Sequence, residues 1–333
     1  MTRPKVFLSQ PMHQAGIDLL AEHCDVIRGV YYPTASDEEI ATALADADAV
    51  MIRSMPIDAA RMDLAPNLKV IAKHGAGMDS IDIDAASARG VMVANSGDAN
   101  AFAVAQHAVA LMLAVQRRIV PIDKETRAGN YQMREQLAGK LGDLWQRTVG
   151  LVGVGNIGRH AAHMVGRGFN ATVLGFDPGV SAEAMAEAGV IKVETLEELL
   201  RRSDIVSLHL PLTPRTKHII GREQFAIMQK HAIIVNTARG GTIDEAALAE
   251  ALSAGTIAGA GLDVLESEPN IAGSPLFALD QVIVSPHIGG GSEVARINTS
   301  IATAQAILAV FEGGEPEHIV NRDALRASAA VPG

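Results

Sequence analysis

The sequence predicts an α/β protein built from two doubly wound parallel sheets. Short apolar runs of strand length alternate with helical segments along most of the 333 residues, a pattern typical of parallel strands joined by helices. The same plan occurs in each half of the chain, and this length is comfortable for two domains. The predicted strands are 6–8, 49–52, 70–72 and 91–93 in the first half, and 149–152, 172–176, 205–208, 232–235 and 282–284 in the second.

Two apolar helices indicate how the domains follow one another along the chain. The segment Asn100–Gln116 is apolar on nearly every side, which predicts a helix buried all round, between domains or subunits. The segment Ser292–Phe311 follows the last strand of the second half and most simply returns to the first. We therefore expect a discontinuous domain of residues 1–98 and 290–333, with residues 99–289 inserted in it.

The composition argues against several classes of protein. The net charge of −10 means that the average surface repels a polyanion such as DNA. Cys24 is the single cysteine, so no intramolecular disulfide can form. The N-terminus lacks the apolar stretch of a signal peptide, and no apolar run approaches the roughly 20 residues that span a bilayer. We expect a soluble, cytoplasmic protein that binds neither nucleic acid nor membrane.

Other segments carry less specific signals. Gln132–Arg147 has low apolar periodicity and could be an arm that grips a partner subunit, and the Ala-rich tail Asp323–Gly333 is the one part expected to be disordered. His160 and His163 lie three apart on a predicted helix and could share a metal ion. No further ligand pattern accompanies them, so we expect solvent-facing side chains and no metal site. His107, inside the apolar helix, is expected to pack.

The most specific local signal is the string GVGNIG at residues 153–158. The strand VGLV leads into it and the helical segment RHAAHMVGRG leads out, which is the context of a dinucleotide-binding turn. Gly153 would allow the tight turn, Gly155 would let the backbone approach a pyrophosphate, and Gly158 would let helix and strand pack closely. The alternative is a purely structural glycine turn. The start of the helix would present N–H groups and a partial positive charge to the phosphates, beginning at Asn156 and Ile157.

An acidic residue stands where a ribose-binding carboxylate is expected. Asp177 lies 19 positions after Gly158, at the end of the strand TVLGFD. A carboxylate there would accept hydrogen bonds from the adenosine ribose hydroxyls and repel a 2′-phosphate. The spacing therefore favours NAD over NADP, although an unrelated aspartate remains the alternative.

Three later segments each follow a predicted strand and carry reactive side chains. They are NTARGG at 236–241, GLDVLESEP at 261–269 and SPHIGG at 285–290. Ligands of open α/β sheets bind outside the carboxyl ends of the strands, so these segments should face the cofactor. The alternatives are a surface arginine, a plain loop carboxylate and a hydrogen-bonded core histidine. The candidates are Arg239, Asp263, Glu268 and His287.

Together with GAGMDSID and DIVSLHLPLTPRTKHII, these strings resemble the D-isomer-specific 2-hydroxyacid dehydrogenase family, most closely its phosphoglycerate dehydrogenase-like branch. The resemblance spans about Lys69 to Arg296, and the strings occur in the family's order. It implies a Rossmann-type NAD-binding domain at 99–289, inserted in a flavodoxin-like substrate-binding domain, and usually a homodimer. It also implies hydride transfer between NAD (NADH) and C2 of a small anionic 2-oxo or 2-hydroxy acid of D configuration, such as phosphoglycerate, glycerate, glyoxylate or hydroxypyruvate.

The resemblance implies a role for each candidate side chain. Arg239 would bind the substrate carboxylate and carbonyl oxygen, because a guanidinium fork matches a planar anion. His287 would be the acid/base for the substrate oxygen, and Glu268 would hydrogen-bond its ring. Asp263 would contact the nicotinamide carboxamide. Further residues implied along the cofactor are Pro211, Thr216, Ala238 and Gly289.

The substrate would also be held from the first half of the chain. In Gly75–Met78, exposed backbone N–H groups would cup the substrate carboxylate, which assigns Ala76, Gly77 and Met78 to substrate binding. Arg53 matches a family position that can hold the far, often anionic, end of the substrate. Its alternative is a simple surface charge.

Some positions depart from the family pattern. Gln106 stands where the family often has glutamate, SGDANAFAVAQH replaces a more usual proline-bearing loop, and GGGSEVA follows His287. These departures leave open a natural substrate other than phosphoglycerate, and we expect no C-terminal regulatory domain. Two other functions stay open: an NAD-sensing interaction protein of the same fold, and a dehydrogenase for formate or phosphite. Relatives acting on formate pair the histidine with glutamine, whereas this chain has Glu268.

Overall fold

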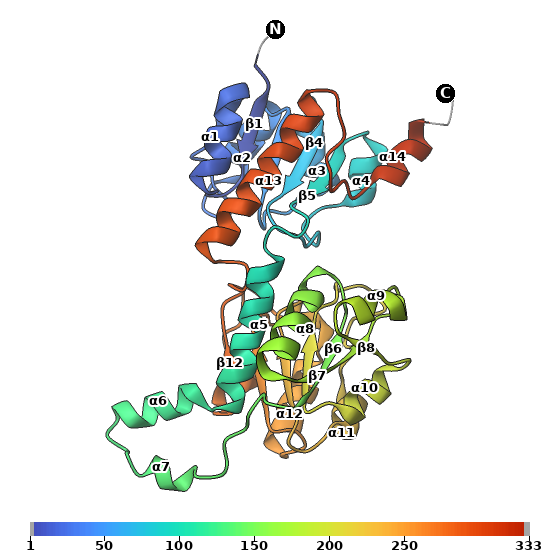
Figure 1. Ribbon diagram of the computed structural model, residues 1–333. Helices are drawn as coiled ribbons and strands as arrows, with labels where there is room; N and C mark the ends of the chain where they lie inside the picture. The colour runs from blue at the N-terminus through green and yellow to red at the C-terminus, as the bar shows by residue number, and fades with distance from the viewer. Residues whose placement is uncertain (1–2, 330–333) are drawn as a thin grey trace. The chain divides into compact units, whose positions relative to one another are not determined.

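The chain folds as two compact units, seen in Figure 1. The computed structural model describes residues 3–329. Unit 1 comprises both ends of the chain, Met1–Asn100 and Gly290–Gly333, and unit 2 is Ala101–Gly289. The first boundary therefore falls two residues later than the sequence indicates.

Unit 1 is a five-stranded parallel sheet with the order β2-β1-β3-β4-β5. This is the flavodoxin-like order, and it confirms the fold predicted for this part of the chain. Of the two outer strands, β2 was not predicted, and β5 begins one residue later than predicted. The strands are β1 (Lys5–Leu8), β2 (Asp25–Ile27), β3 (Ala49–Ile52), β4 (Val70–Lys73) and β5 (Met92–Asn95).

Helices cover both faces of this sheet because successive strand residues point to opposite sides. Val6 and Leu8 face α1 (Gln14–His23) and α13 (Glu293–Phe311), whereas Phe7 faces the opposite group of helices. That group comprises α2 (Asp37–Ala45), α3 (Ala59–Asp63) and α4 (Ile83–Ala88), and a further helix, α14 (Arg322–Ala329), contacts α4.

Unit 2 is a seven-stranded parallel sheet with the order β12-β11-β10-β9-β6-β7-β8. Counted from β6, this is the Rossmann order extended by one strand, as predicted. The strands are β6 (Thr148–Val152), β7 (Thr172–Phe176), β8 (Ile191–Lys192), β9 (Ile205–Leu208), β10 (Ile233–Asn236), β11 (Gly259–Leu262) and β12 (Val282–Val284).

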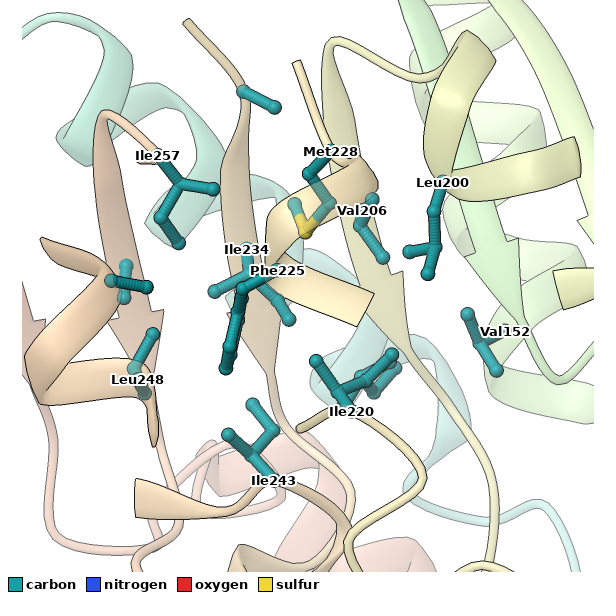
Figure 2. Packing of buried hydrophobic residues seen from close by; sticks show 14 of the residues in the cluster. Val152, Leu200, Val206, Ile220, Phe225, Met228, Ile234, Ile243, Leu248 and Ile257 are labelled. Carbon is teal, nitrogen blue, oxygen red and sulfur yellow. The ribbon is translucent and has the colours of Figure 1, made fainter. Parts of the chain in front are cut away.

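The core of unit 2 lies on both faces of its sheet. On one face, Phe225 and Leu248 belong to the same apolar cluster as Ile234 of the inner strand β10, and part of this cluster is shown in Figure 2. This face is covered by α10 (Leu196–Arg202), α11 (Arg222–Ile227) and α12 (Glu245–Ser253). The other face is covered by α5 (Ala101–Gln116), α8 (Asn156–Phe169) and α9 (Ala182–Glu187).

Three helical segments can be compared with what the sequence predicts. The helix α5 is not buried all round within unit 2, because Phe102 is 59% exposed and Gln106 is exposed on the same side. The segment after it forms α6 (Ile119–Arg127) and α7 (Met133–Gln136), which reach away from the sheet of unit 2 in Figure 1. In the tail, α14 is helical rather than disordered, and residues 330–333 lie outside the described residues.

The expectation that no segment is long and apolar enough to span a bilayer was also wrong. The 19 residues of α13 reach a mean hydropathy of 1.3, which passes that test by length and composition. In unit 1, however, α13 packs against α1 and β4, and its Ala304 and Ile307 are fully buried. These are the contacts of a core helix, whose apolar face needs no lipid to cover it.

Candidate active site

The glycine turn of unit 2 joins β6 to α8 with very close packing. Gly153 has φ +95°, and a Cβ added there would lie 2.5 Å from the carbonyl oxygen of His209. A Cβ on Gly158 would lie 2.4 Å from the carbonyl oxygen of Gly153. Only glycine fits these two positions without a backbone shift.

Gly155 differs from the other two glycines because it faces open space. A Cβ added there would meet no atom within 4 Å. Gly155 is also the N-cap of α8, and no side chain caps this helix. The first N–H groups of α8, from Asn156 and Ile157 onward, therefore lie at an open helix start, where anions are favoured.

Asp177 connects the end of β7 to this turn. One carboxylate oxygen accepts the N–H of Val154 at 2.9 Å, and the other accepts the N–H of Gly179 at 2.9 Å. Each oxygen keeps a second lone pair that a hydroxyl could use. Its predicted contact with a ribose stays a prediction.

Two buried polar atoms near the carboxyl ends of β9 and β10 have no partner within the described chain. They are Nδ1 of His209 and Oγ1 of Thr237. Each residue follows one of the paired positions Leu208 and Asn236, so they lie on neighbouring strands. Burial lowers the pKa of His209 to about 4, which keeps its imidazole neutral at neutral pH.

An unpartnered buried polar atom costs about 1–3 kcal/mol, so such atoms commonly mark a place where a ligand or water supplies the missing bond. The open Gly155, the uncapped start of α8 and these two atoms share one edge of the sheet. The residues present therefore fit a dinucleotide laid along this edge.

Arg239 stands on a turn that is held from inside by Asn236. Asn236 is 1% exposed; its Oδ1 accepts the N–H of Ala238 at 2.9 Å and its Nδ2 donates to the carbonyl of Arg239 at 2.9 Å. Nη1 of the half-buried Arg239 donates to the carbonyl of Ala238 at 2.6 Å. Asn236 received no role from the sequence, although it precedes Arg239 in the same string.

The turn of Arg239 packs directly on the loop that carries Glu268. A Cβ added to Gly240 would lie 2.1 Å from the carbonyl carbon of Leu265, so the two backbones are in contact. Glu268 Oε1 accepts the N–H of Leu265 at 2.7 Å, which fixes the carboxylate beside this contact. The arginine turn and the glutamate loop are thus one packed structure.

The expected contact between Glu268 and His287 is present. His287 Nδ1 lies 2.8 Å from Glu268 Oε2, while the His287 side chain is 51% exposed. The backbone of His287 has φ +53°, and its N–H donates to the carbonyl of Asp263 at 2.8 Å. A carboxylate partner on Nδ1 directs Nε2 outward, where it can exchange a proton with a ligand.

Asp263 holds the same loop through a buried network. It is 2% exposed; Oδ1 accepts the N–H of Ile288 at 2.9 Å, and Oδ2 accepts that of Gly289 at 2.8 Å. Ser285 Oγ donates to Oδ1 at 2.6 Å, and Nε2 of His107 lies 2.8 Å from the same hydroxyl. Burial by itself raises the pKa of Asp263, but the hydrogen bonds from His107, Ser285 and these two N–H groups outweigh it, so the pKa is lowered.

This network corrects the prediction for His107, which is a hydrogen-bonding residue rather than a packing one. Nε2 of His107 also lies 3.3 Å from Asp263 Oδ1. Ser285 was missed as well; its place directly before Pro286 and His287 is the only sequence signal that could have found it. The predicted contact of Asp263 with a nicotinamide stays a prediction.

The remaining cofactor candidates lie in the loop after β9 and beside Arg239. Thr216 closes this loop, because its hydroxyl donates to the carbonyl of Pro211 at 2.6 Å and accepts the N–H of Thr213 at 2.7 Å. Pro211 is exposed and Ala238 is buried. Their predicted contacts with a cofactor stay predictions.

The substrate candidates outside this group all belong to unit 1. Gly75 has φ +124°, and its N–H donates to Ser96 Oγ at 3.1 Å. The following N–H groups make no hydrogen bond to any other part of residues 3–329, so they are available to an anion. They belong to Ala76, Gly77 and Met78.

The sequence is similar to known 2-hydroxyacid dehydrogenases. The family model described as "D-isomer specific 2-hydroxyacid dehydrogenase, NAD binding domain" matches residues 109–289. A D-3-phosphoglycerate dehydrogenase of Methanocaldococcus jannaschii is 38% identical over 320 residues, which cover 95% of this chain and 59% of that relative. The chain thus spans less than two thirds of the length of this relative.

Other relatives match over their whole length. A glyoxylate reductase of Thermofilum pendens is 38% identical over 330 residues, covering 98% of this chain and 97% of the relative. Among solved structures, the holo form of D-mandelate dehydrogenase from Rhodotorula graminis has a TM-score of 0.86 and 30% identity, covering 96% of this chain and 98% of that chain.

Proposed function

This chain belongs to the D-isomer-specific 2-hydroxyacid dehydrogenase family, and we propose that it transfers a hydride between NAD(H) and C2 of a small anionic 2-oxo or 2-hydroxy acid. The observation that carries the proposal is the His287–Glu268 pair at 2.8 Å, on a loop packed against the turn of Arg239. An imidazole that is hydrogen-bonded to a carboxylate suits proton transfer to the carbonyl oxygen of a 2-oxo acid. A guanidinium suits binding of the carboxylate of the same acid.

Each residue has one task in the proposed reduction. Arg239 binds the substrate carboxylate and polarises the carbonyl. NADH, when bound along the glycine turn, supplies the hydride. His287 Nε2 donates a proton to the carbonyl oxygen, so that one hydride and one proton convert the 2-oxo acid to the 2-hydroxy acid. Glu268 keeps Nδ1 occupied and the ring in place, and in oxidation the proton returns to Nε2.

The substrate carboxylate would also be bound by the N–H groups of Ala76, Gly77 and Met78. These groups lack partners within the described chain, and N–H donors on successive residues of a loop can bind an anion without a side chain. We extend the proposal to 2-hydroxy acids that have D configuration wherever C2 is chiral, such as phosphoglycerate, glycerate or the reduced forms of glyoxylate and hydroxypyruvate. The relatives that support this extension are named D-3-phosphoglycerate dehydrogenase and glyoxylate reductase.

The test is a reductase assay with a panel of 2-oxo acids and NADH, read at 340 nm. We expect turnover of at least one acid, with a D-2-hydroxy acid as product on chiral chromatography. Absence of turnover for every acid, while NADH still binds, would favour a role in sensing NAD. Exclusive formation of the L product would contradict the stereochemical part.

We further propose that the chain acts as a homodimer joined through the arm, residues 119–147. No residue of α6 or α7 is buried, and the arm exposes four large apolar side chains. A self-complementary dimer is the commonest way for a protein to cover exposed apolar side chains of this size. A solution mass near twice 34.9 kDa is expected, and a mass of 34.9 kDa would contradict the proposal. The four exposed apolar side chains of the arm are Ile119, Val120, Tyr131 and Trp145.

A further inference from the structure

Helix α5 packs very closely along strand β11 in unit 2. A Cβ added to Gly259 would lie 2.8 Å from Cγ1 of Val115, and a Cβ added to Gly261 would lie 3.0 Å from Cβ of Leu111. The helix can approach the strand this closely because these two strand residues have no side chain. The two rows also match in spacing, since four helix residues span about 6 Å and two strand residues about 6.6 Å.

The next step of the same two rows brings a histidine to an aspartate. His107 is four residues before Leu111, and Asp263 is two residues after Gly261, so each occupies the next position of its own row. Nε2 of His107 lies 3.3 Å from Oδ1 of Asp263, as this register requires. The close packing of α5 on β11 therefore decides that these two side chains meet at the carboxyl end of the strand.

The hydrogen bonds among His107, Ser285 and Asp263 run in one direction. Ser285 Oγ donates its single proton to Asp263 Oδ1 at 2.6 Å. The hydroxyl oxygen can then only accept a proton from Nε2 of His107, which is 2.8 Å away, so this nitrogen carries the proton of the ring. Burial raises the pKa of Asp263, and the hydrogen bond with His107 is the largest of the contacts that lower it. His107 is thus the first donor of a chain that ends on a buried carboxylate.

Asp263 in turn holds the backbone of three successive residues. Its carbonyl accepts the N–H of His287 at 2.8 Å, and its carboxylate accepts the N–H groups of Ile288 and Gly289 at 2.9 and 2.8 Å. The φ of +53° at His287 is uncommon for a residue other than glycine, and such a conformation persists only where surrounding contacts hold it. The bonds to Asp263 are contacts of this kind, so the place of the His287 ring depends on Asp263.

The imidazole of His107 also packs against the far end of this loop. A Cβ added to Gly289 would lie 3.0 Å from Asp263 Oδ2 and 3.6 Å from Cδ2 of His107. Helix α5 is therefore joined to both ends of the segment 285–289, to Ser285 by a hydrogen bond and to Gly289 by packing. His287 lies between these two points of attachment.

We propose that His107 is a positioning residue for the acid/base of this site: its N–H fixes Ser285 and Asp263, and these fix the loop that presents His287. The inference rests on the proposed function and adds to it a helix residue that acts through Asp263 and not on the substrate itself. A displacement of a reacting group by about 1 Å can lower a rate by about 10²-fold, so the loss of this hydrogen bond should be visible in turnover.

The first experiment removes the N–H and then restores it. The side chain in His107→Leu cannot donate a hydrogen bond, whereas the amide nitrogen in His107→Gln can donate from nearly the same position. With the 2-oxo acid that the wild type reduces fastest, His107→Leu should lower kcat by about 10- to 100-fold, and His107→Gln should return it to within about threefold of the wild type. The KM for the acid and the affinity for NADH, measured by fluorescence titration, should change by less than about threefold in both variants.

His163→Leu is the matched control, because His163 is an exposed histidine on helix α8 of the same unit. It should leave kcat within about twofold of the wild type. An unchanged kcat in His107→Leu would overturn the inference. A His107→Gln variant that is as slow as His107→Leu would also overturn it, because the N–H would then not be what the site requires.

Ser285→Ala breaks the same chain at its middle member and takes the place of His107→Leu if that variant does not fold. It should lower kcat by about tenfold, and an unchanged kcat would overturn the inference. The double variant His107→Leu/Ser285→Ala should be at most about threefold slower than the slower single variant, because both substitutions remove one connection. Losses that multiply would show two independent effects and would contradict a chain through Ser285.

A further measurement does not depend on turnover. Hydrogen exchange of the N–H groups of residues 287–289, followed by mass spectrometry of peptides, reports how firmly the loop is held. In His107→Leu these groups should exchange at least about tenfold faster than in the wild type, while those of strand β6 keep their rates. Equal rates in both proteins would overturn the inference. If the wild type reduces no acid with NADH, the proposed function fails, and the exchange rates still decide whether His107 holds the loop.

Discussion

The carboxyl edges of the two sheets differ in how their charged side chains are partnered. In unit 2, His287 is bonded to Glu268, Asp263 accepts four protein donors including His107, and Asn236 holds the turn of Arg239. In unit 1, Arg53 and Arg296 have no acidic partner in the described chain. A catalytic site needs side chains that the protein already holds in place. A binding site for an anion can instead use positive charges that have no partner until the anion binds.

The largest effect is expected when the proposed acid/base group of unit 2 is removed. His287→Asn deletes the proton carrier at Nε2 and should lower kcat by about 10²- to 10⁴-fold, the range of general acid–base catalysis. NADH affinity, measured by fluorescence titration, should stay within about threefold because the glycine turn is untouched. Near-wild-type kcat in this variant would mean that the His287–Glu268 pair is structural.

The glycine turn offers a matched pair of substitutions within unit 2. Gly158→Ala places a Cβ 2.4 Å from the carbonyl oxygen of Gly153 and should lower the free energy of unfolding by about 2–4 kcal/mol through strain. Gly155→Ala meets no atom within 4 Å, so stability should change by less than about 1 kcal/mol while NADH binds at least tenfold more weakly. Urea unfolding and NADH titration measure the two effects; equal destabilisation by both would contradict the distinction.

The buried histidine of unit 1 predicts a dependence of stability on pH. Unfolded His74 takes up a proton near pH 6.5, but folded His74 does so only near pH 4. The stability linked to this group is complete above pH 6.5 and is lost as the pH falls toward 4, by at most about 3 kcal/mol.

Urea unfolding of the wild type and His74→Gln at pH 7 and pH 4.5 tests this dependence. The wild type should lose more stability than the variant between the two pH values, because other titrating groups are common to both. An identical loss in both proteins would show that His74 is not kept neutral by the fold.

The smallest expected effect concerns the choice of cofactor. Asp177 is anchored by two backbone N–H groups and keeps lone pairs for a ribose. Asp177→Ala should reduce the ratio of kcat/KM for NADH over NADPH by about tenfold, since it removes both a hydrogen-bond acceptor and the repulsion of a 2′-phosphate. A wild-type protein that uses both cofactors equally would contradict the assignment before any variant is made.

Much of the fold could be predicted because its signals are local. The strands buried on both faces are continuous apolar runs, such as Val149–Val152, and these were found within one or two residues. Two edge strands were missed, Asp25–Ile27 and Ile191–Lys192, which are short and each pair on one side only. The internal strand Gly259–Leu262 was also missing from the predicted strands, because its two glycines interrupt the apolar run. Local composition does not distinguish such a segment from a loop.

The candidate site divides in the same way. The string GVGNIG was predicted from its place between a strand and a helix. Arg239, Glu268 and His287 were predicted from their places after predicted strands and from the family resemblance, and the contact between Glu268 and His287 spans only 19 positions. The link from His107 to Ser285 spans 178 positions. No periodicity marks His107 as polar and functional, because it lies in a helix that otherwise reads as apolar.

The sequence by itself determined the alternation of strands and helices, the glycine turn and the order of the reactive strings, since each depends on residues close together in the chain. Tertiary structure alone decided which distant groups meet. His74 touches Ser300 across 226 positions, and Arg53 comes near Arg296 because α13 returns to the first sheet. Such contacts depend on how helices pack over a completed sheet, and short-range patterns carry no record of that packing.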